Sequence, residues 1–183
     1  MKRTIAVLLS LVLMSGACDT LNMAKCDYKY HSISDLTLVG VNPKNPGILG
    51  TAKLGEAFLS SEAPLPLTFT LNLDVTNPNK DAASLSGGTY VLFIDGIKMT
   101  EGVLPKFQVN AGATAMMPIG MAFDLRTALS GKSSDAIKNL AFNFAGIGDG
   151  ESKVKVILSP KVVVAGVTLP SPDVPIEFTV GGE

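Results

Sequence analysis

Apolar and polar residues alternate without interruption between residues 65 and 76 of the chain. The apolar side chains fall on the odd-numbered positions, which are Leu65, Leu67, Phe69, Leu71, Leu73 and Val75. Successive side chains of a β-strand point to opposite faces, so the pattern predicts a long strand with one dry and one solvated face. Such one-sided wetting is typical of antiparallel sheets, and two such sheets cover their dry faces by packing together. We therefore expect an all-β protein built as an antiparallel β-sandwich.

Shorter segments with strand character surround the long strand. They cover residues 34–41, 89–94, 97–100, 106–109, 114–123, 153–158, 161–167 and 174–180. Asp95-Gly96 stands between two of these segments and predicts a tight hairpin, because glycine accepts a positive φ without a Cβ clash. The close spacing of strands and turns agrees with the sandwich.

Two regions carry helical spacing instead. Between residues 125 and 144, apolar side chains recur every three or four positions, which predicts a helical insert. Gly131 is expected to divide this insert, with Ser134 as the N-cap of its second part. A weaker amphipathic pattern over residues 48–59 predicts a short additional helix, although Gly50 and Gly55 disfavour it.

The N-terminus has the composition of an export signal. Lys2 and Arg3 precede an apolar run over residues 5–14, which is followed by small residues. The run is shorter than the roughly 20 apolar residues that a membrane-spanning helix needs. We expect residues 1–17 to be a signal peptide and the mature protein to be exported.

The end of this signal determines the fate of Cys18. Residues 13–18 read Leu-Met-Ser-Gly-Ala-Cys and resemble a bacterial lipobox, in which the cysteine receives a diacylglycerol and becomes the first residue. Ser15 departs from the leucine usual at that place, and an ordinary signal peptidase would also accept Ser15 and Ala17. Lipidation of Cys18 would leave Cys26 unpaired, whereas ordinary cleavage would permit a disulfide between the two cysteines.

The expected domain organisation follows from these features. Residues 1–17 are the signal peptide, residues 18–33 form a lipid-attached polar tether, and residues 34–183 form one domain. The 15 basic and 16 acidic residues are mixed along the chain, and no Lys/Arg cluster occurs beyond the signal. Because a nucleic-acid binder needs such a basic footprint, we expect no nucleic-acid partner.

Asn77-Pro78-Asn79 ends the long strand. The proline ring disfavours a helical backbone at Asn77, and Pro78 has no N–H to donate to a neighbouring strand. Each asparagine side chain can bond the backbone two residues further on, which closes a turn. The tripeptide is therefore expected to be a structural strand stop that needs no ligand.

The order of elements around this tripeptide resembles a known family. Residues 74–79 read Asp-Val-Thr-Asn-Pro-Asn after the alternating strand, residues 90–96 read Tyr-Val-Leu-Phe-Ile-Asp-Gly, and an alternating strand follows at Met117–Met121. These features are similar to the late-embryogenesis-abundant type 2 domain, also called the water-stress and hypersensitive-response domain. The resemblance implies a sandwich like that of fibronectin type III or immunoglobulin modules, and a non-catalytic role in desiccation or other stress. The signal, the lipobox-like cysteine and the insert at 125–144 depart from that family.

No catalytic set emerges from the sequence. His31 is the one histidine and falls in the expected tether, so a general base has no positioned nucleophile beside it. His31 and Cys26 supply too few strong ligands for zinc, and the glycine-rich residues 146–151 lack the spacing of a phosphate or calcium loop. We expect no enzyme, no catalytic residue, no metal and no cofactor.

The sequence thus favours a non-enzymatic, lipid-anchored cell-envelope protein that protects or supports the envelope under stress through non-covalent contacts. The alternative is a binding or adaptor module that recruits a protein or a small apolar ligand through its loops or an exposed strand edge. For a Gram-negative host we expect the outer membrane, although Asp19 after the cysteine resembles an inner-membrane retention signal of some bacteria. The sequence leaves the ligand and the oligomeric state open.

Overall fold

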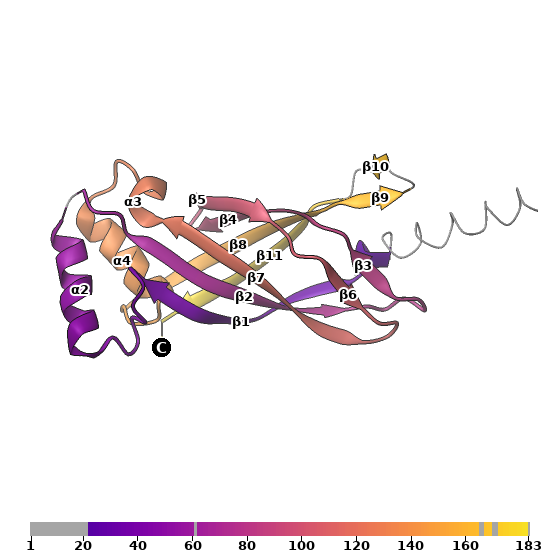
Figure 1. The fold of residues 1–183 in the computed structure, drawn as a ribbon, viewed down its shortest axis with the longest axis horizontal. Coiled ribbons are helices and arrows are strands. Elements are labelled where there is room, and N and C mark those ends of the chain that lie inside the picture. The colour runs from indigo at the N-terminus through magenta and orange to yellow at the C-terminus, as the bar shows by residue number, and fades with distance from the viewer. Residues whose placement is uncertain (1–21, 61, 165–166, 170–171, 183) are drawn as a thin grey trace, which may run out of the picture.

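The computed structural model describes residues 22–60, 62–164, 167–169 and 172–182, which form an elongated β-sandwich (Figure 1). Two antiparallel sheets make up the sandwich. The first has the order β1-β2-β7 and the second has the order β11-β8-β4-β5. Their bounds are β1 Asp27–Leu38, β2 Pro66–Thr76, β4 Gly88–Ile94, β5 Ile97–Val103, β7 Thr114–Asp124, β8 Glu151–Pro160 and β11 Val174–Gly181. The all-β sandwich predicted from the sequence is confirmed.

The core lies between the two sheets and is built on the odd-numbered residues of β2. All five of their apolar side chains, and that of Leu65 just before the strand, are at most 3 % exposed. They share one cluster with Leu92, Val156 and Leu158 of the second sheet. Tyr90 of β4 crosses the core and donates its hydroxyl to the carbonyl of Gly120 in β7, at 3.3 Å. The even-numbered face of β2 is less solvated than expected, because Asn72 is buried and its amide donates to the hydroxyls of Ser32 and Ser34.

Strand β2 pairs with β7 without a register shift, from Pro66 opposite Asp124 to Thr76 opposite Thr114. Strand β7 is one of the two edges of its sheet, and Pro118 lies midway along it, opposite Asn72. The hairpin between β4 and β5 turns at Asp95 and Gly96, which both have a positive φ, as the Asp-Gly signal predicted.

The first strand begins earlier than the sequence indicated. We expected a tether over residues 18–33 and a strand from Ser34, but β1 already begins at Asp27. Two register shifts, between Tyr30 and Ser32 and between Ser34 and Thr37, interrupt the pairing of β1 with β2. Each bulge changes which side chains face the core, so the period of two is hidden in the sequence.

Two other strand predictions need correction. The single strand expected over residues 161–167 is wrong, because β9 (Val162–Val164) pairs antiparallel with β10 (Val167–Leu169) in a small separate sheet. Strand β3 (Ala83–Leu85) was not predicted, and it pairs with β6 (Phe107–Val109). Both small sheets lie toward the same end of the sandwich in Figure 1.

The helices gather at the opposite end (Figure 1). They are α2 Gly47–Leu59, α3 Leu125–Ala128 and α4 Ser134–Phe144. The insert is divided around Gly131 as expected, but the N-cap of α4 is Ser133, whose hydroxyl accepts from the N–H of Ala136 at 3.2 Å. Within the described residues, none of the helices has the length and hydropathy to cross a bilayer.

Candidate functional site

Asn77, Pro78 and Asn79 form a corner at the end of β2, which we call the asparagine corner. Strand β2 ends at Thr76, and the side chain of Asn77 is fully buried. Its amide nitrogen lies 2.9–3.2 Å from the carbonyl oxygens of Asp81, Val109 and Asn110. Its amide oxygen accepts from the backbone N–H of Asn79 at 3.0 Å, which is the local turn that the sequence predicted.

The same corner holds the first described residues. The side-chain amide of Asn79 donates to the carbonyl of Asn22 at 3.0 Å, and the hydroxyl of Tyr28 donates to the carbonyl of Met23 at 3.1 Å. Met23 is 1 % exposed, so the folded body reaches back almost to the start of the described chain. Residues 1–17 and Cys18, which carry the expected signal and lipid, lie outside the described residues.

Cys26 belongs to the folded body rather than to a tether. It is buried, and its thiol lies 3.4 Å from the carbonyl of Asn22. Burial raises the pKa of the Cys26 thiol, and the neighbouring carboxylate of Asp27 raises it further. Because the thiolate is the nucleophilic form, this shift lowers the reactivity of Cys26.

His31 lies on the solvated face of the first sheet. Its Nδ1 is 3.0 Å from a carboxylate oxygen of Asp74 on the neighbouring strand, and both side chains are well exposed. The pair lies on a solvated sheet surface, where polar side chains are usual. The described residues contain no cluster of three or more His, Cys, Asp or Glu side chains suited to a metal ion.

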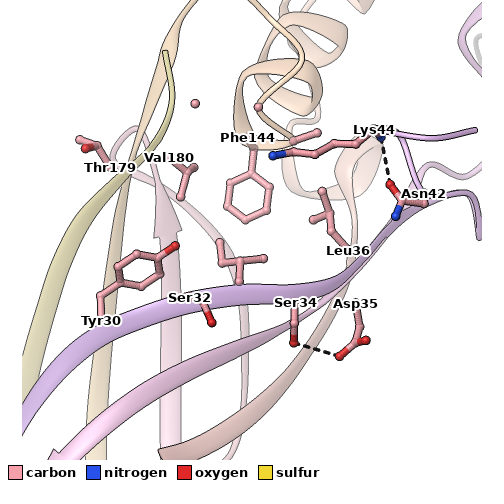
Figure 2. A pocket seen from close by; sticks show the side chains of 14 residues that line it. Tyr30, Ser32, Ser34, Asp35, Leu36, Asn42, Lys44, Phe144, Thr179 and Val180 are labelled. Atoms are coloured by element: carbon pink, nitrogen blue, oxygen red, sulfur yellow. Dashed lines mark hydrogen bonds between the residues drawn. The ribbon is translucent and has the colours of Figure 1, made fainter. Parts of the chain in front are cut away.

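A cleft opens between β1 and β11, the adjacent edge strands of the two sheets, and we call it the edge cleft (Figure 2). Its volume is about 460 Å³, within the roughly 300–1,000 Å³ typical of small-molecule sites. The C-terminal end of α4 closes one side. Its apolar lining comes from Tyr30, Ile33, Leu36, Phe144 and Val180.

The polar groups of the edge cleft stand around this apolar lining. The ring of Tyr30 stacks on that of Phe178 with 3.9 Å between ring centroids, and its hydroxyl points into the cleft (Figure 2). Burial raises the pKa of this hydroxyl, so it stays a neutral donor and acceptor. Lys44 reaches across the cleft beside Phe144 (Figure 2) and lies close to Gly146, which follows Ala145, the C-cap of α4. Helix C-termini attract cations, so a structural role for Lys44 accounts for its position.

Helix α2 is held by a side chain that is distant from it in the sequence. The guanidinium of Arg126, in α3, donates to the carbonyl of Ala63 at 2.6 Å and to that of Ala57 at 3.0 Å, and it also donates to the carbonyl of Ser60. These carbonyls lie in the last turn of α2 and just beyond it. More than 60 residues separate the partners, so no local pattern indicates the contact.

No protein-family profile and no curated protein matches the chain. Among solved structures, a protein from Archaeoglobus fulgidus is similar with 11 % identity over 86 % of this chain and 95 % of that one, at a TM-score of 0.40. A Bacillus subtilis protein described as a lipoprotein is 14 % identical over 86 % of this chain, which spans only 37 % of that one, at a TM-score of 0.39. A protein described as late embryogenesis abundant is 11 % identical over 98 % of this chain and 83 % of that one, at a TM-score of 0.38. These similarities establish no family for the chain.

Proposed function

We propose that the protein is a non-enzymatic component of the cell envelope, held at a membrane by a diacylglycerol on Cys18. The observation that carries the proposal is the lipobox-like sequence at residues 13–18, which directly follows a signal-like apolar run. Lipid chains bury methylenes in the bilayer at about 0.8 kcal/mol each, and a diacylglycerol supplies two such chains.

The position of Asn22 supports this arrangement. The chain from Cys18 to Asn22 spans at most about 14 Å, even when it is fully extended. Because Asn79 binds the carbonyl of Asn22, the asparagine corner would rest close to the bilayer surface. The proposed anchor therefore works without the long tether that the sequence suggested.

The non-catalytic part of the proposal is supported by the surroundings of His31. Acyl-transfer enzymes place a histidine beside a nucleophile, whereas His31 contacts the carboxylate of Asp74 on an open surface. The resemblance of residues 74–79 to the late-embryogenesis-abundant type 2 domain adds a protective role in drying or osmotic stress. Such a role needs only a stable, solvated surface.

Lipidation can be tested by the mass of the mature chain purified from membranes of the native host. We expect a chain that begins at Cys18 and carries a diacylglycerol. Cys18→Ser should remove both the lipid and the membrane association, whereas Cys26→Ala should retain them because Cys26 lies inside the body. A mature chain without diacylglycerol would overturn the proposed anchor.

A ligand-binding module is the second candidate, and the edge cleft favours it. The cleft combines apolar and aromatic side chains with a hydroxyl and an ammonium group, as small-molecule sites do. Leu36→Arg would fill the cleft, because Leu36 is part of its lining and is only partly buried. If binding is the function, a molecule that co-purifies with the native chain should be lost from this variant. A deletion strain sensitive to drying, rescued equally by the native and the Leu36→Arg chains, would favour the protective role instead.

A further inference from the structure

Helix α2 exposes apolar side chains on the side that faces away from the protein. Ile48, Leu49 and Leu59 are 86–90 % exposed, whereas Leu54 and Ala57 on the other side are buried. A helix that is apolar on both sides has a second surface to cover, and large exposed aliphatic patches mark interaction sites. We call the exposed side the α2 face and define it as Ile48, Leu49, Ala52, Gly55 and Leu59.

The α2 face lies far from the proposed anchor. Strand β2 begins beside the end of α2 and finishes at the asparagine corner, so its eleven residues, about 35 Å, separate the two ends (Figure 1). With Cys18 anchored beside Asn22 and the long axis of the body upright on the membrane, α2 stands away from the bilayer. This orientation rests on the proposed function. The partner of the α2 face is then another protein surface rather than the bilayer.

The residues of the α2 face match a second copy of themselves. In an antiparallel pair related by a twofold axis near the middle of α2, Ile48 lies opposite Leu59 of the second copy, and Ala52 lies opposite Gly55. The large side chains thus meet at the two ends, and the small residues let the helix axes approach at the centre. A Cβ added at Gly55 meets nothing within 4 Å in the isolated chain, so this central position is open to a partner.

Charge complementarity supports the same pairing. Lys53 and Glu56 stand three positions apart on one flank of the α2 face, and both are exposed. Among the described residues, neither of them forms an ion pair. Twofold antiparallel pairing brings this flank of one copy against the same flank of the other. Lys53 of each copy then lies near Glu56 of the second copy. We propose that the α2 face is a self-association surface on which two copies of the chain pair through antiparallel α2 helices.

The size of the contact sets its strength. A 13-residue helix is about 20 Å long, so the pair forms a contact at the low end of specific interfaces. Association in free solution is therefore weak. Anchoring both copies in one membrane raises their effective concentration and favours the pair.

Sedimentation analysis of the mature chain with Cys18→Ser, over about 1 μM to 1 mM, tests the proposal without the lipid. We expect a reversible dimer at the upper end of this range. Leu59→Glu should weaken dimerisation at least tenfold, because it buries a charge against Ile48 of the second copy. Val103→Glu is the matched control, since Val103 is 78 % exposed on β5 and lies outside the α2 face.

Charge reversal makes the test specific for the antiparallel pair. Lys53→Glu alone and Glu56→Lys alone should each weaken dimerisation, and the double variant should restore it because the opposite charges meet again. The proposal would be overturned if the chain stays monomeric throughout the concentration range or if the double variant fails to dimerise again. It would also be overturned if Val103→Glu weakens dimerisation as much as Leu59→Glu does. Flotation of the unlipidated chain with phosphatidylcholine vesicles, abolished by Leu59→Glu, would overturn it as well by making α2 a membrane surface. A missing diacylglycerol on Cys18 would instead remove the anchor and leave the dimer measurement intact.

Discussion

Asn77 acts at the scale of a single residue to join three parts of the chain. Its amide nitrogen contacts carbonyls after β2, in β6 and in the turn between β6 and β7, while its oxygen closes the local turn to Asn79. Only a side chain with both a donor and an acceptor end can satisfy this set. The sequence predicted the turn, but the contacts with Val109 and Asn110 cross more than 30 residues.

Asn77→Ala should destabilise the protein by about 3 kcal/mol, because buried carbonyl oxygens lose their donor. Asn77→Asp should cost at least as much at pH 7, since a buried carboxylate would face the same carbonyls. That environment raises the pKa of the introduced carboxyl above its unfolded value. The free energy of unfolding of the aspartate variant should therefore fall further below that of the native chain as pH rises through the raised pKa of the carboxyl. The difference should shrink at lower pH, where the protonated acid can donate.

Denaturant midpoints at pH 7 and pH 4 would measure both effects, with Asn45→Ala at an exposed turn position as the control. An Asn77→Ala midpoint equal to that of the native chain would show that the corner contributes nothing to stability. An aspartate variant with the same deficit at both pH values would refute the donor argument.

At the scale of elements, α2 shows how a poor helix can persist. It has no side-chain N-cap and contains two internal glycines, which together disfavour it by roughly 2 kcal/mol. Packing of Leu54 and Ala57 and the three carbonyl bonds of Arg126 oppose this loss. The edge-to-face contact between Phe58 and Phe142 further ties α2 to α4.

Arg126→Met keeps the aliphatic length of the side chain and removes its donors. We expect α2 to open locally, because carbonyls at its C-terminal end lose a charged donor worth about 2 kcal/mol. Hydrogen exchange should accelerate in residues 47–60 and stay unchanged in β2. Lys132→Met, at an exposed position between α3 and α4, is the matched control. Equal protection of α2 in both variants would mean that packing alone holds the helix.

Strand β1 marks the limit of pattern-based prediction at this scale. Its first half faces Tyr28 and Tyr30 toward the core, but the two bulges then shift the phase, and Asp35 adopts a positive φ. Strand β2 has no such break with β7, so its alternation is visible in the sequence. The difference is the bulges, which depend on the partner strand and leave no periodic signal.

For the whole molecule, the sequence predicted the sandwich because the alternation of β2 requires a second apolar layer. The sequence did not predict the edge cleft or the α2 face. Tyr30, Phe144 and Val180 come from three distant segments and meet only once both sheets and α4 are in place. The helical pattern over residues 48–59 was correct, but it cannot show which apolar residues the rest of the chain leaves uncovered.

The position of Pro118 bears on how the protein tolerates crowding. A strand at the rim of a sheet can recruit the same strand from a neighbouring molecule, and loss of water brings neighbours together. Pro118 interrupts this rim midway along an eleven-residue strand, where it supplies no hydrogen-bond donor and presents a rigid ring. The rim of β7 is thus a poor template for fibril growth, so folded molecules that crowd together have little chance to join edge to edge.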